Sequence, residues 1–260
     1  MRILVTFALK AEVSPWSSRH AFVPYEFENW ERRREFDLFK ANIGRDEVTV
    51  LLTGIGPKSA IQAISSIPIE LHDICISAGL AGSLDPELKA GTIVAARMAQ
   101  ALEGDSQTAS DTILLDLAFS CGARIIDVSL TSDKIVSSAD EKESLSPRAS
   151  IVEMESACIL AAAQQARVPA IVARAISDAA DEDLPVDFQR ILDSRGHLKI
   201  GGLLKEVGLS PYRIPLLVQF SRRSHAAAKS LATFLDRFVP AVSEKYAKLA
   251  QATVEEVSAT

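Results

Sequence analysis

The chain is poor in the residues that build disulfide frameworks and metal centres. Among 260 residues it has three cysteines and four histidines. Cys75, Cys121 and Cys158 are far apart and lie in apolar surroundings, which is typical of reduced, buried thiols and predicts a cytoplasmic protein. No two histidines have the spacing of metal ligands, so we expect no metal and no other cofactor.

Long apolar runs and positive charge are also lacking. No run of 18 or more apolar residues could cross a bilayer, and the apolar opening Met1–Ala8 is too short and too early for a signal peptide. The net charge of −6 argues against broad nucleic-acid binding, because an acidic surface repels phosphates. No internal repeat, low-complexity tract or linker divides the chain, so we expect a single domain over residues 1–260.

Short apolar, β-rich runs alternate with helical stretches along the chain. The predicted strands are Arg2–Phe7, Val48–Thr53, Ile74–Ala78, Thr92–Ala96 and Ala170–Ile176. This alternation predicts an α/β fold, a mixed twisted sheet flanked by helices. Glycine turns are expected at Gly54 and Gly79, where two of these strands end.

Three further segments have a predicted conformation. The charged, aromatic-bearing stretch between Trp16 and Asp46 partly alternates polar and apolar residues, which indicates a hairpin of the same sheet. Residues 111–121 are expected to be helical. Near the carboxyl end, Ser224–Phe238 and Ala241–Val254 are predicted as two amphipathic helices separated by Pro240.

Carboxylates stand at both ends of one buried helix-strand unit. Residues 154–167 are strong helix formers and mostly apolar, and the strand run that follows is typical of a parallel strand covered on both faces. Glu155 lies in the first turn of this helix, and Asp178 lies just past the strand. Ligands of open α/β sheets bind outside the carboxyl ends of strands, so we expect both acids to face one pocket.

Each acid also has a purely structural interpretation. Asp178 could be the N-cap of a helix over residues 179–184. Glu12 and Glu155 could each be a first-turn acid that interacts favourably with a helix dipole. Glu153 and Arg174 are expected to form a structural ion pair, because a buried arginine in a strand needs a carboxylate partner.

Several motifs, in order, resemble the nucleoside phosphorylase and nucleosidase superfamily, and most closely the 5′-methylthioadenosine/S-adenosylhomocysteine nucleosidases. They extend over roughly residues 1–190. The matching motifs are Ala8-Leu9-Lys10-Ala11-Glu12-Val13, Thr53-Gly54-Ile55-Gly56-Pro57, Ala78-Gly79-Leu80-Ala81-Gly82-Ser83-Leu84, Val152-Glu153-Met154-Glu155 and Arg174-Ala175-Ile176-Ser177-Asp178. One glycine motif alone would be weak evidence, whereas five in order are specific.

The resemblance implies cleavage of a purine N-glycosidic bond through an oxocarbenium-like transition state. Asp178 would be the general acid that protonates the purine at N7, a task suited to a carboxyl whose pKa is raised by burial or by a neighbouring acid. Glu12 would orient and deprotonate the attacking water. The remaining implied substrate contacts are Met154 and Glu155 at the ribose, Ile135 and Val136 at the base, and Gly79, Leu80 and Ile55 in the glycine motifs.

The nucleophile and the substrate stay open at this point. The first loop has no glycine-rich phosphate cradle, and Glu12 would repel phosphate, which favours hydrolysis. Lys10 or Arg97 could still hold phosphate, so a phosphorylase is the alternative, and an inactive nucleoside-binding module is a further one. Leu80 and Ile135 replace the serine and the base-stacking aromatic that are usual in the nucleosidases, so the substrate is not fixed beyond a purine nucleoside such as a 5′-modified adenosine.

Residues 195–224 are additional to the nucleosidase pattern and interleave leucine, isoleucine and valine with arginine and lysine. This amphipathic segment resembles the corresponding region of hopanoid-associated phosphorylases, which act on the lipid-linked nucleoside adenosylhopane. Contact with a membrane surface is therefore an open interpretation. Packing on the body or in a homodimer is favoured, because exposed apolar patches more often serve protein contacts.

Overall fold

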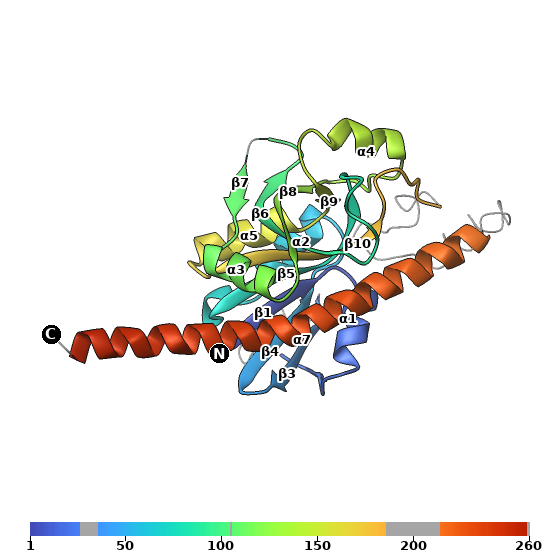
Figure 1. Ribbon diagram of the computed structural model, residues 1–260. Coiled ribbons are helices and arrows are strands. Elements are labelled where there is room, and N and C mark those ends of the chain that lie inside the picture. Colours follow the sequence, from blue (N-terminus) through green and yellow to red (C-terminus); the bar gives the residue numbers. More distant parts are fainter. Residues whose placement is uncertain (27–35, 105, 186–213, 259–260) are drawn as a thin grey trace.

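The computed structural model describes residues 1–26, 36–104, 106–185 and 214–258. A twisted sheet forms the centre of the molecule, with helices on both faces (Figure 1). The strands are β1 (Arg2–Phe7), β2 (Val23–Pro24), β3 (Leu38–Ile43), β4 (Asp46–Leu52), β5 (Ile74–Ser83), β6 (Ile93–Ala101), β7 (Gln107–Ala109), β8 (Arg124–Thr131), β9 (Ile151–Glu153) and β10 (Ala170–Asp178). The helices are α1 (Lys10–Ser17), α2 (Pro57–Ile64), α3 (Thr112–Ser120), α4 (Ala139–Leu145), α5 (Ser156–Gln165) and α7 (Ile214–Ser258), with a 3-10 helix at Ile69–Leu71.

The sheet is mixed and partly closed. Its strand order is β10-β6-β8-β9-β5-β1-β4-β3-β2, with β7 added beside β6. β10 pairs in parallel with β5 and antiparallel with β6, so the path β10-β6-β8-β9-β5 closes on itself. The closed part brings the ends of β5, β9 and β10 together. Gly79 and Leu80 lie on β5, Asp178 ends β10, and Met154 and Glu155 directly follow β9. The predicted fold class is confirmed.

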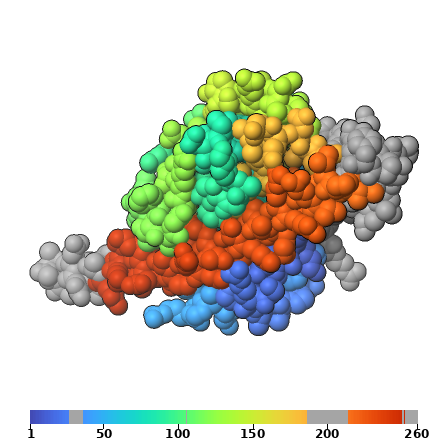
Figure 2. Space-filling view, turned by 45° about the vertical axis from the view of Figure 1, so that its right-hand side comes forward, coloured from blue at the N-terminus to red at the C-terminus, as the bar shows by residue number. Residues whose placement is uncertain are grey.

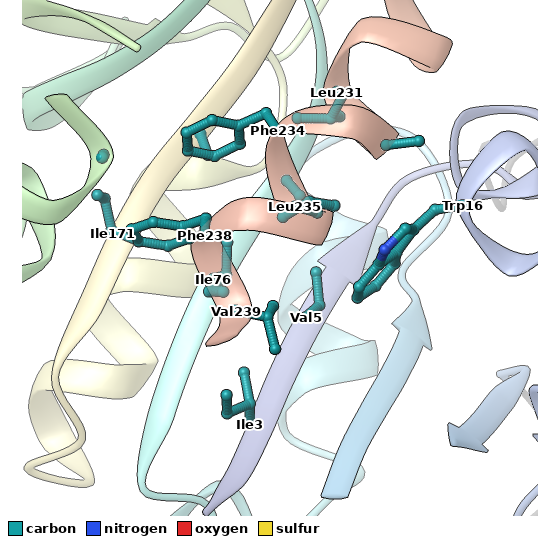
Figure 3. Close-up of a cluster of buried hydrophobic side chains, with 14 of the residues drawn as sticks. Ile3, Val5, Trp16, Ile76, Ile171, Leu231, Phe234, Leu235, Phe238 and Val239 are labelled. Atoms are coloured by element: carbon teal, nitrogen blue, oxygen red, sulfur yellow. The ribbon is translucent and has the colours of Figure 1, made fainter. Parts of the chain in front are cut away.

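Two apolar layers cover the two faces of the sheet. On one face α2 and α5 pack through alanines and aliphatic side chains such as Ala60, Ala63, Ile159 and Leu160. On the other face α7 lies across the strands, with α1 and α3 beside it (Figures 1 and 2). Figure 3 shows its apolar side chains, among them Phe234, Leu235 and Phe238, directed toward Ile3, Val5, Ile76 and Ile171 of three strands. Burial of this stripe holds the long helix on the body.

The carboxyl-terminal region differs from the prediction, because α7 is one helix of 45 residues that continues through Pro240. Proline cannot donate the hydrogen bond that an interior helix position requires, which is why a break was expected. Phe238, Val239 and Val242 around it are all fully buried. Their burial favours the continuous helix over a turn that would withdraw them from the sheet. Of the amphipathic segment 195–224, residues 195–213 lie outside the described part, and the rest begins α7.

Two other predictions need correction. Gly79 was expected in a turn, but β5 runs on to Ser83 and β10 pairs with it as far as Gly82. The hairpin predicted between Trp16 and Asp46 is only partly correct. The strands β2 and β3 in this stretch do pair antiparallel, but Trp16 belongs to the helix α1. Residues 27–35 lie outside the described part. Among the described helices, none combines the length and the apolar character needed to cross a membrane.

Candidate active site

Glu12 on α1 joins the first helix to the central strand β5. Its Oε2 accepts hydrogen bonds from the backbone N–H groups of Ala8 and Leu9, each at 3.0 Å. Its Oε1 accepts one from Leu80 at 3.1 Å. The first two bonds satisfy backbone N–H groups at the start of α1, so Glu12 does act as a first-turn acid of this helix. The third bond holds its carboxylate beside β5. Burial raises the pKa of Glu12 above its ordinary value, against the opposing hydrogen bonds.

Glu153 and Arg174 form the predicted buried ion pair. Arg174 Nη2 lies 2.7 Å from Glu153 Oε2, and both side chains are almost fully buried. Ser156 donates to the same oxygen through its backbone N–H at 2.8 Å and its hydroxyl at 2.9 Å, and Thr131 donates its hydroxyl to Oε1. Burial would raise the pKa of Glu153, but the Arg174 charge and these hydrogen bonds outweigh it and lower that pKa.

Part of the Arg174 guanidinium has no partner. Nε and Nη1 are buried and have no hydrogen bond among the described residues. A Cβ placed on Gly79 would lie 3.0 Å from Arg174 Nη1 and 3.3 Å from Glu12 Oε1. Both polar atoms therefore approach Gly79 so closely that residue 79 has no room for a Cβ. Buried guanidinium donors are normally paired, so this one indicates a place for a polar ligand atom.

Glu155 was expected in the first turn of the helix, but it occupies the N-cap position, one residue before α5 begins. Its side chain does not cap α5 but reaches across to α2, where Oε1 accepts the backbone N–H of Gly56 at 2.8 Å. The Met154 methyl group is 3.7 Å from where a Cβ on Gly56 would lie. Burial and the charge of Glu153 raise the pKa of Glu155 to about 8. In the ligand-free protein this carboxyl is thus mostly protonated at neutral pH.

Asp178 is the last residue of β10, and residues 179–184 form no helix, so the N-cap interpretation is wrong. Ser177 donates its hydroxyl to Asp178 Oδ1 at 2.6 Å, and Lys142 Nζ lies 2.6 Å from Oδ2. A Cβ on Gly82 would be 3.0 Å from Oδ2. The neighbouring charge is therefore a lysine, whereas an apolar setting or a second acid had been expected.

The strand β5 sets the separation between the two ends of the site. Glu12 lies against Gly79, and Asp178 lies against Gly82, which is three residues beyond Gly79 along β5. At about 3.3 Å per strand residue this places the two acids on the order of 10 Å apart along the strand. A nucleoside, in which a ribose is joined to a base, is long enough to reach from one acid to the other.

The other predicted residues lie in segments around these acids. Ile55 is in the turn between β4 and α2, next to Gly56, and is partly exposed. Ile135 and Val136 follow β8 and precede α4. Val136 is buried against Leu84, the residue directly after β5, whereas Ile135 is partly exposed. The structure thus brings Glu12 and Asp178, which are 166 positions apart in the chain, to the same strand β5.

Comparisons with known proteins show the family and the fold of the chain. The family model described as "Phosphorylase superfamily" matches residues 2–204. The chain belongs to the phosphorylase superfamily. Among curated proteins, the 5′-methylthioadenosine/S-adenosylhomocysteine nucleosidase of Staphylococcus saprophyticus is 25% identical over 179 residues, which are 60% of this chain and 78% of that protein. The enzyme of the same name from Staphylococcus carnosus is 26% identical over 178 residues, 59% and 78% of the two chains.

Several solved structures share the fold of this chain. The Campylobacter jejuni 5′-methylthioadenosine/S-adenosylhomocysteine nucleosidase superposes with a TM-score of 0.69 at 18% identity, covering 92% of this chain and 98% of the other. The Neisseria meningitidis nucleosidase in complex with methylthio-immucillin-A gives 0.68 at 22% identity, with the same coverage. A futalosine hydrolase mutant of Helicobacter pylori gives 0.67 at 20% identity, covering 92% and 99%.

The sequence analysis missed Lys142 and the hydroxyl groups that support Arg174. Ser77 and Ser156 accept hydrogen bonds from Arg174 Nη2 at 3.1 and 2.9 Å. Ser156 lies three residues after Glu153, the predicted partner of Arg174, which was a usable signal for its contact, whereas Ser77 is 97 residues from Arg174 and had none. Lys142 had no such signal, because α4 reads ADEKESL and a lysine in so polar a helix ordinarily lies in water.

Proposed function

We propose that this protein hydrolyses the N-glycosidic bond of a purine nucleoside, and that the substrate is a 5′-modified adenosine such as 5′-methylthioadenosine or S-adenosylhomocysteine. The names of the curated relatives support the reaction, and the arrangement of Glu12, Arg174 and Asp178 along β5 supports the chemistry. Adenine would leave and the 5′-modified ribose would be released as the free sugar.

The unpaired Arg174 Nη1 beside Glu12 is the observation that carries this proposal. A water molecule above Gly79 could accept a hydrogen bond from Nη1 and donate one to Glu12 Oε1. Glu12 would then take a proton from that water as its oxygen bonds to C1′ of the ribose. A carboxyl whose pKa burial has raised is a stronger base than an ordinary glutamate, which suits this task.

Proton delivery to the base completes the reaction. Asp178 in its acid form would protonate N7 while the C1′–N9 bond breaks and its electron pair moves onto the purine. Glu155 would accept hydrogen bonds from the ribose 2′ and 3′ hydroxyl groups. Since its pKa is about 8 in the free protein, substrate binding would be coupled to loss of that proton. Met154, Leu80, Ile55, Ile135 and Val136 would line the sugar and the base.

The test is release of free base from 5′-methylthioadenosine, S-adenosylhomocysteine and adenosine, each with and without phosphate, with chromatography of the sugar product. Phosphate-independent release of adenine and a free pentose is the expected result. A sugar 1-phosphate formed only with phosphate would replace this proposal with the phosphorylase alternative. Tight nucleoside binding without any release would favour the inactive binding module.

Two variants test the assigned acids. Asp178→Asn should abolish adenine release and leave the fold and most of the binding intact, and Glu12→Gln should abolish hydrolysis. Matched controls are Asp127→Asn and Glu244→Gln, because both side chains are exposed and lie outside the proposed site. Wild-type turnover in Asp178→Asn would refute its role as general acid.

Five statements stay predictions from the sequence. They are homodimer assembly, a cytoplasmic location, the absence of a cofactor, one domain over residues 1–260, and the absence of nucleic-acid binding. Contact of the segment 195–224 with a membrane also stays untested, because most of that segment lies outside the described residues.

A further inference from the structure

A buried lysine lies behind the proposed general acid. Lys142 belongs to α4, whose other residues are mostly polar and accessible, yet its side chain is 0% exposed. Nζ donates to Asp178 Oδ2 at 2.6 Å, to the Ala179 carbonyl at 2.7 Å and to the Glu182 carbonyl at 2.8 Å. All three N–H bonds of the ammonium group are thus used. Every hydrogen bond that an ammonium can make is directed at Asp178 and the backbone directly after it.

Anchoring of the backbone does not by itself account for this lysine. Two other contacts already join α4 and its flank to the same segment: Ala139 N–H donates to Asp183 Oδ1 at 2.8 Å, and Leu184 N–H donates to the Ser137 carbonyl at 2.8 Å. Burying a lysine carries a large desolvation cost, and a buried ion pair is weak evidence for a gain in stability. The feature that these two contacts do not supply is a positive charge at Asp178.

We propose that Lys142 is a positioning residue for the general acid, and that its ammonium group stabilises the carboxylate that Asp178 becomes as its proton moves to the base. This inference rests on the proposed function. In that step the O–H bond of Asp178 breaks, N7 gains the proton, and the C1′–N9 electron pair stays on the purine. Asp178 is left with a full negative charge 2.6 Å from Nζ. A fixed charge placed where charge develops lowers the barrier, because it needs no reorganisation during the reaction.

The same contacts fix the direction of the acid. Ser177 holds Oδ1 and Lys142 holds Oδ2, so the carboxyl plane is defined from both sides. Glu182 extends the support, because its side chain pairs with Arg223 of α7 and accepts the Ala179 N–H. Lys142 therefore links the acid to a segment that α7 also holds, and it does so without touching the substrate itself.

The experiment compares Lys142→Met, which removes the charge, with Lys142→Gln, which removes the charge but keeps N–H donors for the two carbonyl groups. Lys248→Met is the matched control, because Lys248 is exposed and pairs with the exposed Glu244 on α7. Base release is measured at saturating and limiting nucleoside to separate kcat from KM. Both Lys142 variants should lose about 10²-fold in kcat, the size found when one preorganised donor is removed, with KM changed less than about threefold.

Two further measurements separate this role from simple damage to the fold. The double variant Asp178→Asn with Lys142→Met removes both buried charges together. Any residual base release that Asp178→Asn retains at high enzyme concentration should not fall further in the double variant, because both residues act in one proton transfer. Circular dichroism and thermal melting establish that each variant is folded. If Lys142→Met does not fold, Lys142→Gln and the double variant still provide the comparison.

The possible outcomes are distinct. Wild-type kcat in a folded Lys142→Met or Lys142→Gln variant would overturn the role of Lys142 and leave the proposed function standing. Losses that multiply in the double variant, or a fall in kcat for Lys142→Met with none for Lys142→Gln, would show that Lys142 acts independently of the charge on Asp178. If the wild-type protein releases no base from any nucleoside, the proposed function and this inference both fail.

Discussion

Glu153 and Glu155 are two residues apart and both buried, yet they should affect stability in opposite directions. Folding raises the pKa of Glu155 from 4.5 to about 8 and lowers that of Glu153. Between pH 4.5 and 8 the folded chain therefore keeps a proton on Glu155 that the unfolded chain has lost. The contribution of Glu155 to the free energy of unfolding must therefore fall as the pH rises through this range.

The magnitude follows from the shift. From 4.5 to about 8 is about 3.5 pH units, and at roughly 1.36 kcal/mol for each unit the ceiling above pH 8 is about 5 kcal/mol. Glu153 contributes part of that cost through its charge, so Glu155→Gln should recover about 2–4 kcal/mol at pH 8 and about 1 kcal/mol or less at pH 5. Glutamine keeps an oxygen for the Gly56 N–H, so the variant removes the titration without losing that hydrogen bond.

Glu153→Gln should do the reverse. The carboxylate stabilises the fold above the unfolded pKa of 4.5, and this contribution is lost as the pH falls through the lowered folded value. Its removal leaves the Arg174 guanidinium buried without the carboxylate that is hydrogen-bonded to it, so we expect a loss of about 3–5 kcal/mol at neutral pH. This loss should shrink in acid.

The assay is urea unfolding at half-unit steps from about pH 3 to pH 8, with the exposed Glu70→Gln as control. The wild-type curve should slope downward with pH, and that of Glu155→Gln should be flatter. A constant difference between Glu155→Gln and the wild type at every pH would refute the reasoning, because a titrating group cannot contribute a pH-independent term. Nucleoside turnover in Glu155→Gln should fall even as stability rises, a trade-off typical of binding residues.

Three other substitutions test the packing and the site. Phe238→Ala empties a fully buried position under α7 and should cost about 3–5 kcal/mol in denaturant unfolding, with KM unchanged. Gly79→Ala puts a methyl group 3.0 Å from Arg174 Nη1, so kcat for base release should fall about tenfold or more, and wild-type kcat would contradict the proposed water position. Trp16→Phe removes the Nε1 hydrogen bond to Asp236 at 2.9 Å and should lower the free energy of unfolding by about 1–2 kcal/mol, measured in the same way.

Local patterns in the sequence were enough for much of the fold. The apolar runs at Arg2–Phe7 and Ala170–Ile176 appear as β1 and β10, because strand formation there depends on residues that are adjacent in sequence. The helix before β10 was expected at 154–167 and is found at Ser156–Gln165. The partnership of Glu153 with Arg174 could also be predicted, because a buried charge requires an opposite one wherever the chain places it.

Contacts between distant segments decided the rest. Pro240 breaks an isolated helix, but the burial of Phe238, Val239 and Val242 on the sheet keeps α7 continuous. Gly79 and Gly82 have the composition of a turn, but pairing of β10 with β5 keeps them in a strand. In both cases tertiary packing outweighs a local preference worth only a few kcal/mol.

The sequence by itself determined which acids the site contains, because their residue types and their order along the chain are local facts. Only the tertiary structure decided their charge environment. Glu12 is held by a backbone group 68 residues away, and Asp178 is paired with Lys142 from a helix that looks fully solvated in sequence. Burial and hydrogen bonding of a side chain depend on what folds against it, and no window of neighbouring residues contains that information.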